Sequence, residues 1–424
     1  MNHDSIQTIK QRALFPSLAQ FHVMLWCFFL FATSAVYAVD KTGETSYGSI
    51  DLYVAQILAF SALALIFSTM YVSMTRRVHA FVPAPVNWLA GYAAVAFITV
   101  PVSPNALFTF IKASQLLAVI MLAVVAGSVR CQVKIRPERL IDITYYVLIA
   151  CMIVAWTVAI ARPDLGTHID IGKLQLGKIP FHYTTLGGMA SVVAVAFFVR
   201  FIDRGARGDL IIFLFSVLTL AATKARLSTL YVVIAMFAVL FIYRRWAWLT
   251  AYFMAGASIL IVGPVREAII DFAYRQQSLE TLMNLNGRVT AWIWGLERFW
   301  DHPVIGHGYY TGSRYLMPDG FTGLTLKQFH NDLLNILFNT GAAGLLCVAG
   351  VYVSAVISIR RLPRSQADRP RRIAVELGAV LSIIFATGLV HSSIGWDAWY
   401  MMFVFAAVAV TLVNYGERPI RART

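Results

Sequence analysis

Residues 329–346 read FHNDLLNILFNTGAAGLL, a stretch that is apolar enough to enter a membrane but carries a histidine and three asparagines. Asn331, Asn335 and Asn339 recur every fourth residue, which places them on one face of a helix. An amide group exposed to hydrocarbon is costly. We therefore expect this face to contact protein rather than lipid.

His330 stands at the start of this predicted helix, and Gly341 and Gly344 lie further along it. On an unbroken helix Gly341 falls on the same face as His330, about three turns away. Two small residues one turn apart let a neighbouring helix approach closely in a membrane. A histidine at a helix end is more often an interfacial residue than a catalytic one, but the asparagines and glycines around this one favour a functional site.

The whole chain has the composition of an integral membrane protein. Its 424 residues are 59% hydrophobic and 13% charged, with a mean hydropathy of +0.69, far from the values of soluble domains. A helix needs roughly 20 apolar residues to cross the hydrocarbon layer. The sequence predicts an all-α polytopic fold of about twelve spans, at residues 18–38, 51–74, 86–102, 107–127, 143–161, 184–202, 209–223, 228–243, 246–263, 331–359, 373–390 and 396–414.

The positive charge of the chain predicts its orientation. A net charge of +14 is compatible with nucleic-acid binding, but most of the 35 Lys and Arg residues flank short loops on one side of the predicted spans. Basic residues in short loops stay in the cytoplasm. We therefore expect both termini to be cytoplasmic and no nucleic acid to be bound.

One long loop interrupts the series of spans. Residues 1–263 hold the first nine spans, residues 264–330 form a long periplasmic loop, and residues 331–424 hold the last three spans and a short cytoplasmic tail. Long loops in compact proteins are usually functional. We expect this one to carry amphipathic helices and part of the site.

Residues 286–300, NGRVTAWIWGLERFW, are predicted to form an amphipathic helix, because apolar residues recur at helical spacing on one face. Its tryptophans suit the membrane interface. A helix that only covers the bundle is the alternative, but it does not explain Arg288 in the first turn. Basic residues on the side that the charge rule disfavours indicate an anionic ligand, and the loop has six of them: Arg266, Arg275, Arg288, Arg298, Arg314 and Lys327.

A second basic segment is TKARLST (223–229), the predicted tight turn between the spans at 209–223 and 228–243. Lys224 and Arg226 lie at membrane depth, where ionisable groups are functional candidates. The alternative is a pair of side chains that extend to the lipid surface. The predicted topology places this turn on the same side of the membrane as Arg288 and His330.

Read as His-Asn, nine residues and Gly-x-x-Gly, residues 330–344 resemble the signature of bacterial O-antigen ligases. The wider superfamily includes O-antigen polymerases and protein O-oligosaccharyltransferases. Other features agree with this resemblance: the number of spans, the long loop before the histidine helix, the arginine in the 223–229 turn, and the run GR…W…HPxxGxG around Arg288. The specific motifs cover residues from about 223 to 345.

The resemblance implies a GT-C-like glycosyltransferase in the inner membrane of a Gram-negative bacterium. Such an enzyme transfers a preassembled glycan from undecaprenyl diphosphate to the lipid A core oligosaccharide on the periplasmic face. The donor already carries a good leaving group, so the enzyme needs cations for the departing diphosphate and a base for the acceptor hydroxyl. We expect Arg226, Arg288 and Lys224 to supply the cations and His330 to be the base, supported by Asn331, Gly341 and Gly344 of the motif.

The sequence indicates no metal and no cofactor. It has no Asp-x-Asp pair and no Cys-x-x-Cys pair among its four cysteines. It also has no Gly-x-x-x-x-Gly-Lys-Ser/Thr loop, because Ile179 follows the lysine in the run GKLQLGK at residues 172–178. The activated donor would supply the energy. Because no carboxylate nucleophile is apparent, we expect inversion at the anomeric carbon.

Three alternatives stay open. A polymerase or a protein transferase would use the same donor, but the former is expected to have a second large periplasmic loop and the latter a large C-terminal part. A transporter or flippase would carry polar residues in many spans, whereas here Gln56, Lys112 and Gln115 are exceptions. The acceptor site could be lined by His182, His391, Trp396 and Asp397, or these could be ordinary interface residues.

The predicted topology can be tested by cysteine labelling. A cysteine introduced near Gly320 in the long loop should react with a membrane-impermeant reagent added outside, and one at Gln366 should not. Protection near Gly320 together with labelling at Gln366 would reverse the orientation and remove the basis for a periplasmic site.

Overall fold

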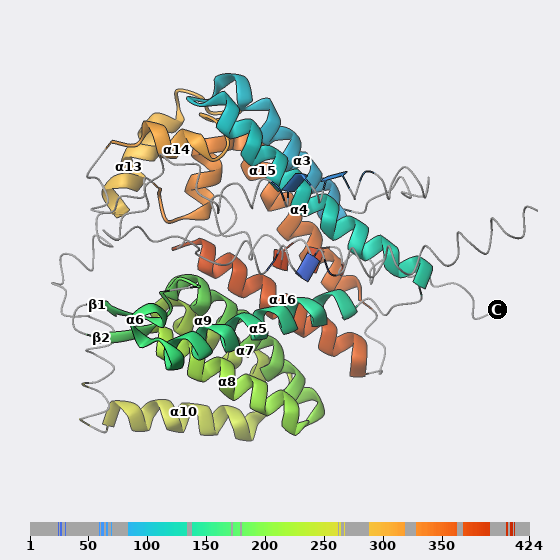
Figure 1. The fold of residues 1–424 in the computed structure, drawn as a ribbon. Coiled ribbons are helices and arrows are strands. Elements are labelled where there is room, and N and C mark those ends of the chain that lie inside the picture. The colour runs from blue at the N-terminus through green and yellow to red at the C-terminus, as the bar shows by residue number, and fades with distance from the viewer. Residues whose placement is uncertain are drawn as a thin grey trace, which may run out of the picture.

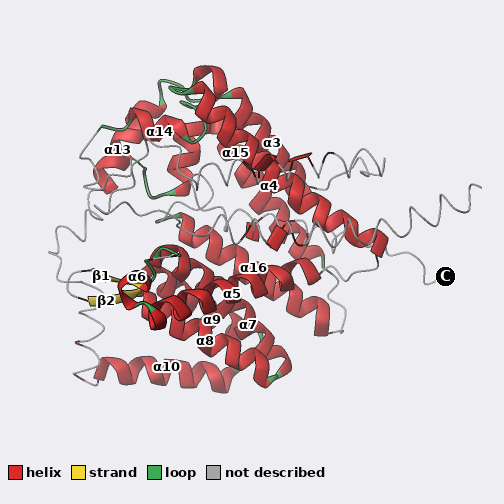
Figure 2. Cartoon of the chain, in the orientation of Figure 1, coloured by secondary structure: helices red, strands yellow, loops and turns green. Residues whose placement is uncertain are grey.

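The structure, a computed structural model, describes residues 84–133, 138–170, 173–178, 180–261, 288–318, 328–362 and 368–390, with isolated positions elsewhere. Almost all of this part is helical (Figure 2). The elements are α3 (Ala84–Ile98), η1 (Val100–Val102), α4 (Ala106–Val133), α5 (Glu138–Ala161), α6 (Pro163–Gly166), β1 (Thr167–Asp170), β2 (Lys173–Leu176), α7 (Tyr183–Arg204), α8 (Arg207–Thr223), α9 (Arg226–Ile242), α10 (Trp246–Ile261), α13 (Arg288–Phe299), α14 (Thr311–Leu316), α15 (Asp332–Arg361) and α16 (Asp368–Gly388).

The apolar helices of this part confirm a multi-pass membrane protein. Five described helices are long and apolar enough to cross a membrane, namely those that contain residues 85–102, 106–124, 139–161, 183–204 and 332–361, and α9 is a shorter apolar helix. Each predicted span between residues 86 and 390 coincides with a described helix. The predicted spans at 18–38, 51–74 and 396–414 lie largely outside the described residues. The count of twelve and the GT-C-like arrangement therefore stay predictions.

Helix α7 is the centre of the larger helix group. Its side chains are buried on all sides from Leu186 to Arg200, because α5, α8, α9 and α16 pack around it. Figure 1 shows this group on one side of α16, with α3 and α4 beside α15 on the other. A helix that is hydrophobic all round needs such a central position.

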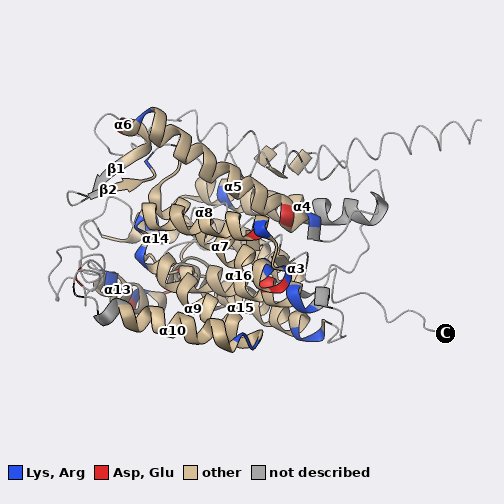
Figure 3. Ribbon diagram, turned by 90° about the horizontal axis from the view of Figure 1, so that it is seen from below, with Lys and Arg blue, Asp and Glu red and all other residues tan. Residues whose placement is uncertain are grey.

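The fold has one feature that the all-α prediction missed, a small hairpin after α5. Strands β1 and β2 pair antiparallel, with Thr167 opposite Leu176 and Asp170 opposite Lys173. Figure 1 shows the hairpin, α6, α13 and α14 at the same end of the molecule. This end is the one that the charge pattern predicts to be periplasmic, and the long helices are largely free of charge between their two ends (Figure 3).

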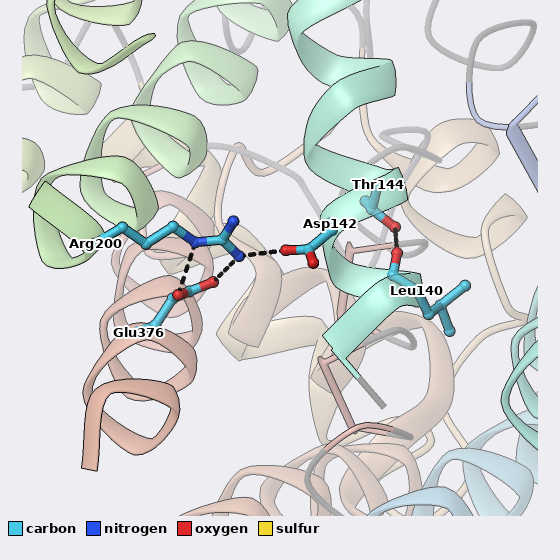
Figure 4. Close-up of polar contacts among 5 residues, drawn as sticks. All are labelled: Leu140, Asp142, Thr144, Arg200 and Glu376. Carbon is cyan, nitrogen blue, oxygen red and sulfur yellow. Dashed lines mark hydrogen bonds and ion pairs between the residues drawn. The ribbon is translucent and has the colours of Figure 1, made fainter. Parts of the chain in front are cut away.

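A buried ion network joins three helices at the opposite end. The Arg200 guanidinium of α7 donates to both carboxylate oxygens of Glu376 in α16, at 2.9 and 2.6 Å, and to Asp142 in α5 at 2.6 Å (Figure 4). The rings of Tyr145 and Phe197 lie against the same guanidinium. Because Arg200 is the shared donor, the network holds α5, α7 and α16 together at the predicted cytoplasmic end.

Removing one member of this network should destabilise the fold. The substitution Glu376→Ala leaves Arg200 buried with a single carboxylate, and breaking a buried ion pair in this way costs about 3–5 kcal/mol. The melting temperature of the detergent-purified protein should fall clearly. The matched control is Asp164→Asn, which breaks the exposed pair of Arg162 and Asp164 and should leave the melting temperature unchanged. Equal effects of the two substitutions would contradict a stabilising role for the network.

Candidate active site

His330 lies just before α15 rather than on it. Asn331 is the N-cap, and its side-chain oxygen accepts from the Leu334 backbone N–H at 3.1 Å. His330 itself is buried and has a backbone φ of +50°. The predicted placement of His330 on the same unbroken helix face as Gly341 is therefore wrong, because the chain turns sharply between the histidine and the helix.

Helix α15 is also broken, at Gly341, where φ is 66° and ψ is −168°. In an unbroken helix the N–H groups of Ala342 and Ala343 would donate to the carbonyls of Phe338 and Asn339. Here Ala342 donates to Pro303 at 2.8 Å, and Ala343 donates to Val304 at 3.0 Å. Two backbone bonds of the helix have thus been exchanged for bonds to the loop that precedes α14.

The same loop satisfies the carbonyls that the break leaves open. His307 N–H donates to Phe338 at 2.9 Å, and Gly308 N–H donates to Asn339 at 3.0 Å. The approach is close: a Cβ on Gly341 would overlap the Val304 carbonyl, and a Cβ on Gly306 would lie 2.5 Å from the Asn339 carbonyl carbon. Gly306 of HPVIGHG and Gly341 of Gly-x-x-Gly therefore serve one contact between two backbones.

The asparagine face contacts protein, as predicted. Asn335 and Asn339 are fully buried. The Asn335 side-chain oxygen accepts from Phe329 N–H at 3.4 Å, and that of Asn339 accepts from Ser313 N–H of α14 at 2.8 Å. Gly344 faces its own helix neighbour Thr340 and the Tyr92 ring of α3, which confirms the close helix approach for this glycine but not for Gly341.

Helix α13 holds the residue before His330. The predicted helix at 286–300 is confirmed from Arg288 to Phe299. The Trp292 indole N–H donates to the Phe329 carbonyl at 2.7 Å, and the Phe329 ring packs on Gly295 so closely that no Cβ fits there. Because Trp292 lies one turn after Arg288, α13 links its arginine to the residue that precedes His330.

Arg288 reaches the end of α16. Its guanidinium donates to the Val390 carbonyl at 2.8 Å, and Gly388, two residues earlier, lies against the Asp332 carboxylate. Burial lowers the pKa of Arg288, while the nearby Tyr183 phenol acts in the opposite direction. A guanidinium still stays charged at neutral pH. Its Nε–H has no hydrogen-bond acceptor within the described part of the chain.

We call the region around Arg288, His330 and the end of α16 the corner. The turn between α8 and α9 lies at the same end of α7 as this corner. Lys224 has a left-handed backbone conformation with φ 50°, and Arg226 is the first residue of α9. Ala225 packs against Gly187 of α7, which is one turn after Tyr183, the residue near Arg288. Ala225 thus connects this turn to the N-terminal part of α7, where Tyr183 lies near Arg288.

Of the proposed acceptor residues, only His182 is described, because His391, Trp396 and Asp397 lie outside the described residues. His182 is the exposed N-cap of α7: its Nδ1 accepts from Thr184 N–H at 3.4 Å, and its ring lies on Tyr183. His182 thus adjoins Tyr183, the residue that interacts electrostatically with Arg288.

Sequence reasoning missed His307 as a site residue. Its buried ring stacks on Phe338 with the centroids 4.3 Å apart, and its Nδ1–H donates to the Phe338 carbonyl at 3.2 Å. Burial lowers its pKa, so the ring is neutral at pH 7. Its signal in the sequence is the flanking pair of glycines in GHG. His307 holds the loop in the break of α15.

No group of three or more His, Cys, Asp and Glu residues that could hold a metal ion occurs among the described residues. Metal-independent chemistry remains a prediction. The described cysteines Cys27, Cys151 and Cys347 are free thiols.

Residues 211–349 match the family model described as O-Antigen ligase. This match covers about a third of the chain, which is therefore similar to O-antigen ligases over this segment. The match extends from α8 into α15. It includes the turn with Lys224 and Arg226, the start of α13 at Arg288, the loop 303–308 and the break at Gly341. The family is one of glycosyl-transferring enzymes of the O-antigen ligase and polymerase type. No curated protein matches the chain.

The contact between the loop and the broken helix predicts a strong effect of small substitutions. Gly341→Ala places a Cβ on the Val304 carbonyl and forces a residue other than glycine into a conformation that only glycine adopts readily. Glycosyl transfer and melting temperature should both fall. Gly256→Ala is the control, because a Cβ there meets nothing within 4 Å, and it should leave both unchanged. A Gly341→Ala protein with normal activity would show that the break is not required.

Proposed function

We propose that this protein transfers a preassembled glycan from undecaprenyl diphosphate to the lipid A core, on the periplasmic face of a Gram-negative inner membrane. The observation that carries the proposal is the corner where Trp292 of α13 holds Phe329, next to His330, while Arg288 one turn earlier binds the end of α16. A base and a fixed cation are thus held by the same helix contact.

The reaction needs only these two kinds of group. His330 accepts the proton of the acceptor hydroxyl, whose oxygen attacks the anomeric carbon of the donor sugar. The bond from this carbon to the diphosphate oxygen breaks, and the oxygen keeps the electron pair. Arg288 donates to the departing diphosphate. Its Nε–H has no acceptor among the described residues and can therefore bind a ligand oxygen.

The other predicted residues have supporting roles. Lys224 and Arg226 bring further positive charge to the diphosphate from the turn beside α7. Asn331 caps the helix that follows the base, and Gly341 and Gly344 permit the packing that fixes this helix. His182, His391 and Asp397 are candidates to line the acceptor site. The activated donor supplies the energy, so the proposal requires no metal and no cofactor, and attack from the face opposite the diphosphate inverts the anomeric centre.

An assay with purified protein tests the proposal against its alternatives. The donor is supplied in EDTA without nucleotide, together with lipid A core, a pilin-like peptide, or no added acceptor. We expect glycan transfer to lipid A core alone. Transfer to the peptide indicates a protein transferase, glycan extension without acceptor indicates a polymerase, and movement of the intact donor across a vesicle membrane indicates a flippase. An absolute requirement for a divalent cation would contradict the proposed chemistry.

Substitutions should separate the base from the cations. His330→Ala removes the proton acceptor, so single-turnover transfer should fall by roughly 10²- to 10⁴-fold while donor affinity is retained. Arg288→Ala or Arg226→Ala should weaken both donor binding and transfer, and Arg→Lys should restore them only in part, because a point charge replaces a bidentate donor.

The matched control is Arg298→Ala on the same helix as Arg288, where the side chain is exposed and pairs only with Asp301 at 3.5 Å among the described residues. It should behave like the wild type. Near-normal transfer by His330→Ala would limit the histidine to a structural role, and unchanged donor affinity in the Arg288 and Arg226 variants would remove them from the donor site.

A further inference from the structure

Helix α4 carries a polar stripe inside its membrane-spanning segment. Thr109, Lys112 and Gln115 follow each other at intervals of three residues, and all three are buried, with Lys112 only 9% exposed. An ionisable residue within a membrane span is costly, and such residues usually face protein and mark a functional site. The ligase corner at Arg288 and His330 does not use this stripe.

The Lys112 ammonium lies on aromatic rings that a second cation also contacts. It is 4.3 Å from the centroid of the Tyr310 ring and 5.7 Å from that of Phe108. The Arg314 guanidinium of α14 lies 5.4 and 5.9 Å from the same two centroids and donates to the Tyr310 hydroxyl. Two positive charges thus contact one pair of rings in a low-dielectric environment, where a bound anion would offset their mutual repulsion.

Tyr310 is held in a costly backbone conformation to reach this position. Its φ of 67° and ψ of −37° are rare for a residue other than glycine. Neighbouring hydrogen bonds hold it there: Tyr309 N–H donates to the Thr99 hydroxyl at 2.9 Å, and the Thr311 hydroxyl bonds with those of Ser103 and Thr109. Strain of this kind concentrates at binding sites.

The surroundings of the two cations suit an amphiphile. Leu107 and Phe110 of α4, on either side of Phe108 in the sequence, are 71% and 52% exposed, and Leu316 of α14 is exposed as well. In a membrane protein such side chains contact lipid. Arg314 is half-buried, so the cation pair adjoins both this apolar rim and the surface.

We propose that Lys112 and Arg314, placed on the Tyr310 ring, form a second anion site that binds the phosphate of a phosphorylated glycolipid headgroup. The inference rests on the proposed function, in which this glycolipid is the acceptor. Lys112 is separate from the turn of Lys224 and Arg226, because α4 lies beside α15, whereas α7 to α9 lie on the other side of α16 (Figure 1). α15 connects the two sites: Phe329 at its start contacts α13, and Asn339 at the break contacts α14.

The test measures binding without transfer. Wild type, Lys112→Met and Arg314→Gln are placed in nanodiscs of zwitterionic lipid, and binding of radiolabelled lipid A core, either phosphorylated or dephosphorylated, is titrated in the absence of donor. The variants should bind the phosphorylated form about tenfold or more weakly, as expected for loss of a hydrogen bond to a charged group. They should bind the dephosphorylated form like the wild type. Arg314→Lys should recover part of the affinity.

Several outcomes would overturn the site. Equal loss for both forms of the glycolipid would show a packing role, and weaker donor binding would place Lys112 in the donor site. Displacement of the glycolipid by inorganic phosphate or phosphatidylglycerol at comparable concentration would show a general phosphate site. Arg298→Gln, which removes an exposed charge from α13, is the control and should change nothing. Arg314→Gln keeps the inference testable if Lys112→Met does not fold.

The binding result is independent of the transfer reaction. Phosphate-dependent binding by a protein without ligase activity would refute the proposed function and retain the anion site. Ligase activity with an unchanged acceptor KM in both variants would support the proposed function and refute the anion site.

Discussion

The docking of residues 303–308 into the break of α15 is the contact on which the site depends. A break in a membrane helix exposes backbone N–H and C=O groups, and each group left without a partner in hydrocarbon is costly. Here the loop supplies a partner for all four groups that the break opens, at Phe338, Asn339, Ala342 and Ala343. The break and the loop conformation therefore stabilise each other, and neither is expected to persist alone.

This contact determines the positions of the helices on both sides of the loop. Helix α13 precedes the loop in the sequence and α14 follows it. The docked segment therefore determines where each of these helices contacts α15. On the α13 side, Trp292 binds the Phe329 carbonyl and brings Arg288 to the end of α16. On the α14 side, Asn339 binds Ser313 and brings Arg314 to the rings above Lys112. One broken helix thus orders both the corner at Arg288 and the pair of cations at the Tyr310 ring.

Much of this arrangement could be predicted from the sequence. Apolar length located the spans between residues 86 and 390, because a membrane helix must satisfy its backbone internally and so needs an uninterrupted apolar run. The cost of buried amides predicted the inward face of Asn335 and Asn339. Topology alone brought Arg226, Arg288 and His330 to the same end of the bundle.

The break itself could not be predicted. The sequence TGAAGLL (340–346) reads like any small-residue helix, since the partners that replace its two lost bonds lie more than thirty residues earlier in the chain. The positive φ of His330 and Tyr310 also depends on tertiary contacts, as local preference disfavours it. Lys112 appeared as an isolated exception in the sequence because its aromatic partner Tyr310 belongs to a distant loop. Local patterns thus predicted elements and sides of the membrane, whereas tertiary hydrogen bonds determined the site.

Cross-linking between the loop and α15 tests whether the loop is docked in the break. In a cysteine-free background, Val304→Cys and Ala343→Cys introduce thiols on residues whose backbones are joined by a 3.0 Å hydrogen bond. Mild oxidation should form this disulfide in the membrane, and the cross-linked protein should still transfer glycan, because the loop stays docked. Failure of the pair to cross-link, or loss of transfer that reduction restores, would contradict a permanently docked loop.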